Sequence, residues 1–325
     1  MRALLCKEFG PPESLVVEDV AVPQPGAGQV RIAVHAAGVN FPDFLIIQDK
    51  YQFKPDLPFA PGGEIAGTIS ALGEGVTAFA VGDKVMASTI HGAFAEEVIA
   101  DVEKTQAVPE AIPHDVAASL NIVYGTSYHA LFDRGALATG ETVLVLGAAG
   151  GVGLATVELA KAGGATVIAA ASSDEKLAVC KERGADLLLN YGEGDFRAKL
   201  KELCPDGPDI IYDPVGGEMT EQAFRSIGWR GRHLVIGFAA GEIPKIPLNL
   251  ALLKQASLVG VFWGAYTRKE PEAYADDMKT LMDWVISGRI RPLVSGHYGL
   301  AEGGRAIRHI ADRKAVGKLV VEPQR

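Results

Sequence analysis

The sequence has few of the residues that mark metal-bound, disulfide-linked or membrane-spanning proteins. Its three cysteines, Cys6, Cys180 and Cys204, are scattered, and no pair has the spacing of a zinc or redox motif. We expect free thiols in a reducing compartment. No uninterrupted run of about 18 apolar residues occurs, and the first residues lead into a strand-like segment rather than the apolar part of a signal peptide. The sequence therefore predicts a cytoplasmic protein without a membrane span.

An excess of positive charge is also lacking. The chain has 31 lysines and arginines against 40 aspartates and glutamates, a formal net charge of −9. Because phosphate backbones and anionic lipids repel an acidic protein, we expect binding neither to nucleic acid nor to membranes. The 325 residues are 48% hydrophobic and 22% charged, which is typical of a protein with a substantial core. At roughly 100–200 residues per domain, this length predicts two domains.

The stretch 141–164 has the pattern of a dinucleotide-binding turn. The aliphatic run Thr142–Leu146 predicts a buried strand, four glycines follow by position 153, and a helical pattern covers Leu154–Ala162. Glycines let the backbone approach a pyrophosphate, and the helix N-terminus offers free N–H groups and a positive dipole end. One departure is that Ala148 stands in the first glycine position of G-x-G-x-x-G, with Gly147 one place earlier.

The first 120 residues predict a small, mostly antiparallel β-domain. Proline and glycine turns separate strand-like runs over 15–20, 30–37, 64–72, 84–87 and 94–99. Glu64 is a charged residue at the start of an apolar strand. An isolated carboxylate at such a place is usually a surface residue or a hydrogen-bonded structural one.

From residue 124 onward, strands and helices alternate, which predicts a doubly wound parallel sheet with helices on both faces. The expected strands after the first cover 166–170, 186–190, 209–213, 233–236 and 258–261, and the helices cover 174–183, 195–203 and 218–227. Ligands bind beyond the carboxyl ends of such strands. The segments expected to surround one ligand are 147–153, 171–176, 191, 214–217 and 237–238.

The end of the second strand of this sheet bears on which dinucleotide binds. An NAD site places Asp or Glu there to hold the ribose 2′-hydroxyl. This chain has Ser172 and Ser173 instead, with Lys176 on the next helical turn, and hydroxyls and an ammonium suit a phosphate better than a carboxylate does. We therefore expect NADPH. Asp174 argues against this, although it would have a structural role as N-cap of the following helix. The alternative for Lys176 is a solvated helix residue without a ligand.

The last 65 residues predict an amphipathic helix over 272–287, a strand over 293–298, a helix over 301–311 and a strand over 318–321. They are too few to bury a core of their own, so we expect them to return to the first domain. The expected boundaries are 1–122 for the catalytic domain, 123–262 for the nucleotide-binding domain and 263–325 for the returning segment.

Several motifs resemble those of the medium-chain dehydrogenase/reductase superfamily, specifically its zinc-free quinone oxidoreductase (ζ-crystallin-like) branch. They lie at Gly38–Asp43, Pro61–Gly67, Gly125–Tyr128, Ala148–Gly153 and Tyr212–Gly217, and the similarity extends over essentially the whole chain. The resemblance implies a Rossmann domain with a GroES-like, mostly antiparallel catalytic domain. Alanine at 148 is typical of that branch.

The zinc-dependent members of the superfamily differ at the metal site. They carry a ligand cysteine where this chain has Asn40, a Gly-His-Glu motif at the place of Gly62–Glu64, and a four-cysteine lobe that this chain lacks. A catalytic zinc needs three protein ligands. We therefore expect no metal.

The resemblance also assigns residues. It implies that Asn40 and Thr126 lie beside the nicotinamide and that the phosphate of the adenosine end contacts Ser172, Lys176 and Tyr191. The complete set expected to bind NADPH is Asn40, Asp43, Thr126, Ala148, Ala149, Gly150, Gly151, Val152, Ser172, Ser173, Lys176, Tyr191, Val215, Gly237, Phe238, Phe262 and Lys318. For catalysis we consider Asn40, Thr126 and Tyr51, the last as proton donor or oxyanion partner, with simple aromatic packing as its alternative.

The expected activity is zinc-independent transfer of a hydride from NADPH to a small electrophilic acceptor, a quinone or another α,β-unsaturated carbonyl. One alternative is reduction of an enoyl thioester or activated alkene. For a thioester, Arg225, Arg230 and Arg232 would form a phosphate-binding groove, with a solvated surface cluster as the alternative for these arginines. Another is an NADPH-binding structural or regulatory protein with little turnover, as in the ζ-crystallins. The apolar segment 256–263 ends the sheet, and because relatives pair this edge across a dimer, we expect a homodimer.

Overall fold

The computed structural model describes residues 1–325, which divide into two compact units. Unit 1 comprises 1–122, 278–287 and 292–325, and unit 2 comprises 123–277 and 288–291. The segment 263–277, which the sequence analysis assigned to the returning part, thus groups with unit 2. The parallel sheet and the antiparallel β-rich domain are both present, which confirms the predicted fold class.

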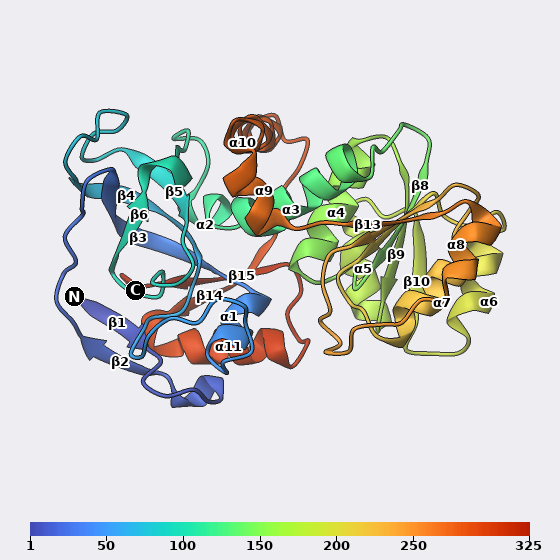
Figure 1. The fold of residues 1–325 in the computed structure, drawn as a ribbon, viewed down its shortest axis with the longest axis horizontal. Coiled ribbons are helices and arrows are strands. Elements are labelled where there is room, and N and C mark those ends of the chain that lie inside the picture. The colour runs from blue at the N-terminus through green and yellow to red at the C-terminus, as the bar shows by residue number, and fades with distance from the viewer. The chain divides into compact units, whose positions relative to one another are not determined.

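Unit 1 is built on a seven-stranded sheet whose central strand is β3 (Gln29–Val39) (Figure 1). Alternate residues of β3 are completely buried, and they form a core with apolar side chains of the neighbouring strands. The strand order is β14-β15-β3-β4-β5-β7, with β6 also paired to β3, and β1 and β2 form a separate antiparallel pair. The remaining strands are β1 (Arg2–Leu5), β2 (Val16–Asp19), β4 (Glu64–Leu72), β5 (Lys84–Ser88), β6 (Glu97–Asp101), β7 (Thr105–Ala107), β14 (Val294–Gly299) and β15 (Lys318–Glu322).

The C-terminal strands complete the sheet of unit 1. Strand β15 pairs antiparallel with β3, and β14 pairs parallel with β15. The last segment therefore returns to the first domain, as expected from its small size. The helices of this unit are short: α1 (Phe41–Ile46), α2 (His114–Ala117) and α11 (Gly303–Ala311).

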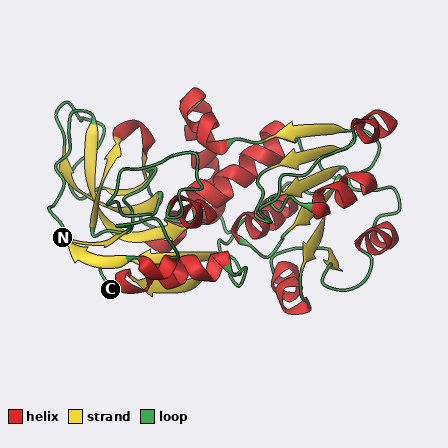
Figure 2. Ribbon diagram, turned by 60° about the horizontal axis from the view of Figure 1, so that its bottom comes forward, coloured by secondary structure: helices red, strands yellow, loops and turns green.

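Unit 2 contains a six-stranded parallel sheet in the order β10-β9-β8-β11-β12-β13. The strands are β8 (Thr142–Leu146), β9 (Thr166–Ala171), β10 (Leu187–Asn190), β11 (Ile210–Asp213), β12 (Arg232–Val235) and β13 (Ser257–Gly260). The chain winds outward from β8 to β10 and then in the opposite direction from β11 to β13. Because parallel crossovers are right-handed, the two halves place their helices on opposite faces, and helices lie on either side of the sheet in Figure 2.

Four helices of unit 2 lie where the alternation predicted them: α4 (Gly151–Ala162), α5 (Asp174–Glu182), α6 (Phe196–Leu203) and α7 (Glu218–Ser226). Three were not predicted: α3 (Gly125–Tyr128), α8 (Leu248–Lys254) and α9 (Trp263–Lys269). Helix α10 (Pro271–Ile286) begins in this unit. Two π-helical segments, Leu120–Tyr124 and His129–Arg134, flank α3. No helix is both long and apolar enough to span a bilayer.

Candidate functional site

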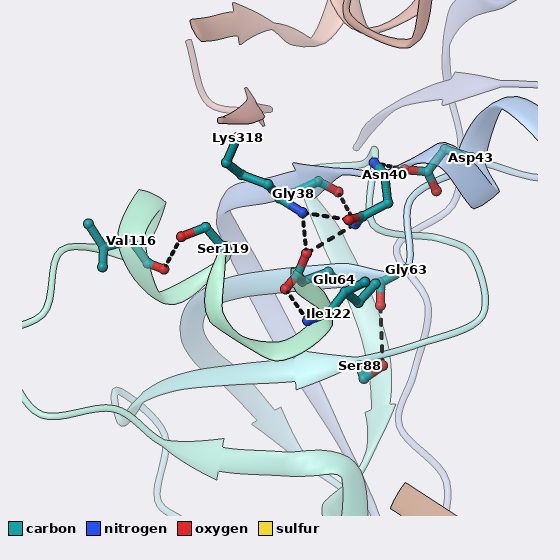
Figure 3. A network of polar contacts seen from close by, with 10 residues as sticks. All are labelled: Gly38, Asn40, Asp43, Gly63, Glu64, Ser88, Val116, Ser119, Ile122 and Lys318. Atoms are coloured by element: carbon teal, nitrogen blue, oxygen red, sulfur yellow. Dashed lines mark hydrogen bonds and ion pairs between the residues drawn. The ribbon is translucent and has the colours of Figure 1, made fainter. Parts of the chain in front are cut away.

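Asn40 lies just beyond β3, where the strands on both sides bring charged side chains to it (Figure 3). The antiparallel register sets Leu319 of β15 opposite Val39, so Lys318 comes beside Asn40. On the other side of β3, strand β4 begins at Glu64. Three residues that are far apart in the sequence therefore meet at one end of the unit 1 sheet, and we call Asn40, Glu64 and Lys318 the Asn40 cluster.

The side chains of the Asn40 cluster are hydrogen-bonded to one another. Lys318 Nζ donates to Asn40 Oδ1 at 2.6 Å and to Glu64 Oε2 at 2.7 Å. Asn40 Nδ2 donates to the same Glu64 oxygen at 3.0 Å and to the carbonyl of Gly38 at 3.2 Å. The other carboxylate oxygen accepts from the N–H of Ile122 at 2.7 Å. Since the ion pair is 4% and 0% exposed, the ammonium balances the carboxylate inside the protein and the cluster fixes the Asn40 amide.

Gly38 is required by this arrangement. A Cβ atom at this position would lie 2.3 Å from the Ala118 carbonyl, 2.6 Å from Glu64 Oε2 and 2.9 Å from Lys318 Cε. Only a glycine lets the lysine and the glutamate approach each other across β3. The glycine in the motif Gly38–Asp43 thus has a packing reason in unit 1.

Asp43 and Tyr51 lie beside the Asn40 cluster. Asp43 Oδ2 accepts from the N–H of Asn40 at 2.7 Å. Burial raises the pKa of Asp43 to about 7, even though that hydrogen bond and the charge of Lys318 oppose the shift. Burial, and then the Asp43 charge, raise the pKa of Tyr51, so its hydroxyl stays protonated at neutral pH and is able to donate. The Tyr51 ring packs on the core of unit 1, with its centroid 5.9 Å from that of Phe53.

The glycine turn of unit 2 joins β8 to α4. Gly147 has a φ of +60°, whereas Ala148 is buried and donates its N–H to the carbonyl of Ala170 at 3.0 Å. Within this turn, Gly147 has the left-handed backbone conformation that favours glycine and Ala148 does not, so alanine fits at 148. A Cβ on Gly153 would lie 2.3 Å from the Gly147 carbonyl, so the helix packs directly on the turn. Helix α4 starts after Gly150 without a side-chain cap, which leaves its first N–H groups for an anion such as a pyrophosphate.

Thr126 is buried in α3, and its neighbour Ser127 ties this helix to the glycine turn. Ser127 Oγ donates to the carbonyl of Val152 at 3.1 Å and lies 3.0 Å from the hydroxyl of Tyr212. The structure therefore brings Thr126 close to the first turn of α4. Gly125 packs against the indole of Trp263, where a Cβ would approach to 2.3 Å. Sequence reasoning missed Ser127 and Trp263. The glycine of the Gly125–Tyr128 motif could have indicated a bulky neighbour packed against the backbone, which is Trp263.

Asp213, at the end of β11, holds the loop that follows it. Its Oδ1 accepts from the N–H groups of Val215 and Gly216 at 2.9 Å each. Its Oδ2 accepts from Thr220 Oγ1 and lies 3.1 Å from His233 Nε2. Burial raises the pKa of Asp213, but His233 and these hydrogen bonds outweigh it, and the net effect is a lowered pKa. The carboxylate is therefore a structural anchor.

The loops after β8, β11 and β12 meet at the carboxyl edge of the sheet. The Val215 side chain lies against Gly147, and the Phe238 ring lies against Gly216. Val215 also accepts from the N–H of Ala240 at 2.8 Å, which joins the loops that contain Val215 and Gly237. Val215 is thus a neighbour of the glycine turn, and Gly237 and Phe238 are neighbours of the loop that contains Val215.

The residues expected around the adenosine phosphate lie at the ends of β9 and β10. Lys176 Nζ donates to Ser172 Oγ at 3.3 Å, so these two are adjacent. The expected N-cap role of Asp174 is wrong, because Ser173 caps α5 and Asp174 is the first helical residue. The N–H of Tyr191 donates to the carbonyl of Ala171 at 3.0 Å, which extends the sheet ladder to this end.

Two further expectations concern exposed residues of unit 2. Phe262 precedes α9 and is 56% exposed. Arg225 pairs with Glu221 and Arg232 pairs with Glu141, each at 2.6 Å. Arg230 and Arg232 do line one pocket of unit 2, but Glu141 and Asp209 line it as well and offset the positive charge that a thioester phosphate would need.

The side chains of residues 1–325 include no group of three or more His, Cys, Asp or Glu arranged to hold a metal ion. The Asn40 cluster would offer an amide and a carboxylate, but the Lys318 ammonium already donates a hydrogen bond to an oxygen of each. An ammonium donates hydrogen bonds and cannot ligate a cation. This donor set does not fit zinc.

Two family models match the chain. The Alcohol dehydrogenase GroES-like domain matches residues 26–110, and the model described as Zinc-binding dehydrogenase matches residues 151–286. These matches fall on unit 1 and on the parallel sheet with its helices.

Individual relatives cover nearly the whole chain. The quinone oxidoreductase-like protein 2 homolog of Nematostella vectensis is 39% identical over 325 residues, with 98% of this chain and 88% of that protein covered. The quinone oxidoreductase of Rattus norvegicus is 34% identical over 325 residues, covering 99% and 97%. Among solved structures, Escherichia coli quinone oxidoreductase complexed with NADPH is similar, with a TM-score of 0.92 and 26% identity over 99% of this chain and 100% of that one.

Proposed function

Since this chain belongs to the medium-chain dehydrogenase/reductase superfamily, in its quinone oxidoreductase branch, we propose that it transfers a hydride from NADPH to a quinone or another α,β-unsaturated carbonyl without zinc. The resemblance inferred from the motifs is confirmed by relatives that match the full length. The relatives support an oxidoreductase of this family. The identity of the acceptor and the independence from zinc are proposals that rest on the Asn40 cluster.

The observation that carries the proposal is the Asn40 cluster. Here the Lys318 ammonium pairs with the buried Glu64 carboxylate and donates a second hydrogen bond to the Asn40 oxygen, so the two groups that could ligate a cation are already engaged. Without a Lewis acid, the acceptor must already be electrophilic. Quinones and enones meet this requirement, because addition of hydride gives a delocalised enolate rather than a bare alkoxide.

The residues of unit 2 fit NADPH. The uncapped start of α4 and the close approach of Gly153 to Gly147 suit a pyrophosphate, and the adjacent Ser172 hydroxyl and Lys176 ammonium suit a phosphate ester. When bound, NADPH supplies the hydride. The remaining expected residues, Ala149, Gly151, Tyr191, Gly237, Phe238 and Phe262, stay part of the proposed binding set.

For the reaction itself we keep Asn40, Thr126 and Tyr51 as the proposed residues. The Asn40 cluster holds the amide in one orientation, and Lys318 uses two of its three N–H donors within the cluster. The Tyr51 hydroxyl remains protonated at neutral pH and would donate to the developing oxyanion.

The proposal includes a homodimer. Strand β13 is the edge of the unit 2 sheet, and large apolar side chains near this edge are exposed: Leu248, Leu252, Leu253 and Leu258. An unpaired edge beside apolar surface is a usual site of association. Sedimentation equilibrium should give twice the chain mass, and a monomer at micromolar concentration would refute this part.

Steady-state oxidation of NADPH tests the function. The acceptors are naphthoquinones, enones, and crotonyl and acryloyl thioesters, assayed after dialysis against a chelator with zinc quantified by metal analysis. We expect turnover with quinones or enones and no stoichiometric zinc. Turnover with thioesters alone would favour the enoyl reductase alternative, and tight NADPH binding without any turnover would favour a structural or regulatory role.

A further inference from the structure

Asn190 is held in place at the end of β10, beside the proposed phosphate-binding residues. The parallel register sets it opposite Ala171, the residue before Ser172. Its carbonyl accepts from Lys199 Nζ at 3.1 Å, and its Oδ1 accepts from the N–H of Gly192 at 2.9 Å. Because the backbone carbonyl and Oδ1 of Asn190 both accept hydrogen bonds, the orientation of its Nδ2 group is fixed.

The Nδ2 group of Asn190 is hydrogen-bonded to the carboxylate of Asp174. Asn190 Nδ2 donates to Asp174 Oδ1 at 2.8 Å. Asp174 is exposed and is the first residue of α5, directly after Ser173. A carboxylate at a helix N-terminus is attracted to the free N–H groups there, where an anionic ligand would also bind.

Asp174 therefore poses a problem for a phosphate ester. Ser172 and Lys176, the two groups that suit the phosphate, lie two residues on either side of it. A free Asp174 would repel the phosphate, and it would also offer an acceptor to the ribose 2′-hydroxyl of NADH, which is the role of an acidic residue at this place in NAD sites.

We propose that Asn190 determines cofactor preference as a positioning residue: its amide holds the Asp174 carboxylate toward β10 and so keeps the Ser172–Lys176 position available to the 2′-phosphate of NADPH. This inference rests on the proposed use of NADPH. It explains how a chain with an aspartate in this segment accommodates a phosphorylated cofactor. Loss of the Asn190 amide frees Asp174, weakens NADPH and spares NADH.

The test is a double-mutant cycle read by isothermal titration calorimetry, with the Kd of NADPH and of NADH measured for each protein. Asn190→Ala should weaken NADPH relative to NADH by about three- to tenfold, the scale of the repulsion that arises when the exposed Asp174 carboxylate comes within a few ångströms of the phosphate. Asp174→Ala is the matched control and should keep the preference for NADPH. In the Asp174→Ala background, Asn190→Ala should change the ratio of the two Kd values by less than about twofold.

Asn190→Asp is the second variant, because it retains an acceptor for the N–H of Gly192 while losing the donor to Asp174. It should weaken NADPH at least as much as the alanine variant does. Melting temperatures of all variants establish that they are folded.

The outcomes separate the two proposals. Equal affinity of the unmodified protein for both cofactors would contradict the use of NADPH, and with it this inference. A clear NADPH preference that Asn190→Ala leaves unchanged would overturn the inference alone. So would a loss that persists in the Asp174→Ala background, because the effect would then come from the turn at Gly192 and not from the carboxylate.

Discussion

Replacing Lys318 by methionine tests the physical account of the Asn40 cluster most directly. The side chain is similar in length, but the ammonium is lost. Glu64 would keep its hydrogen bonds from Asn40 and Ile122 and would lose its counter-charge at a position that is 0% exposed. The variant thus leaves one uncompensated charge in the core of unit 1.

The magnitude follows from the geometry. At the observed separation of 2.7 Å, two unit charges attract by about 6 kcal/mol with an effective dielectric constant of ~20. Desolvation offsets part of this attraction, and removal of one member of a buried pair costs about 3–5 kcal/mol. For a unit of roughly 150–250 residues, which shifts by about 2–4 °C per kcal/mol, the Tm of unit 1 should fall by roughly 6–20 °C.

Differential scanning calorimetry of the Lys318→Met variant and of Lys318→Met with Glu64→Gln measures this cost. The double variant should recover at least half of the loss, because the glutamine amide carries no charge that needs a counter-ion and its oxygen still accepts from the N–H of Ile122. A loss below about 1 kcal/mol, or a double variant no more stable than the single one, would contradict this account of the buried ion pair.

Three further predictions concern single residues. Lys176→Ala should raise the Kd of NADPH about tenfold and that of NADH less than twofold, as measured by calorimetry, and equal losses would remove the phosphate assignment. Tyr51→Phe should lower kcat with a quinone by about tenfold or more while the Tm stays unchanged, because the ring still packs on the core, and unchanged kcat would leave Tyr51 a packing residue. Burial favours the neutral form of Asp43 and raises its pKa from 3.8 to about 7. The stability that depends on the neutral carboxyl is therefore fully present below pH 3.8 and is lost as the pH rises through 7. Urea unfolding of the unmodified protein should show this loss, and Asp43→Asn should flatten it; parallel pH profiles of the two proteins would contradict the raised pKa.

Local patterns in the sequence were sufficient to predict the elements of the parallel sheet. Short aliphatic runs, glycine turns and helical periodicity lie close together in the chain, so the β8 strand and α4 helix were expected near their observed bounds. The run 94–99 shows the limit of such patterns. Strand β6 begins at Glu97, because residues 94–96 pair with β1 instead: Leu4 donates to the Phe94 carbonyl and Glu96 donates to the Arg2 carbonyl.

The partner of a polar side chain was harder to predict. Asp174 was expected to cap a helix, whereas its carboxylate accepts from Asn190, and Ser173 is the cap. Glu64 was recognisable as a charged residue at the start of an apolar strand, but its partner Lys318 comes from the last strand of the chain. No pattern within either segment specifies that pairing.

The class of fold, the dinucleotide turn and the family could be inferred from the residues alone, because these depend on one strand–turn–helix unit or on short motifs. Which charges meet depends on the folded chain. The antiparallel register of β15 on β3 sets Lys318 beside Asn40, and the parallel register of β10 on β9 sets Asn190 beside the segment that contains Asp174. Strand register depends on two segments together. The same two sequences paired in another register would have different side chains as neighbours.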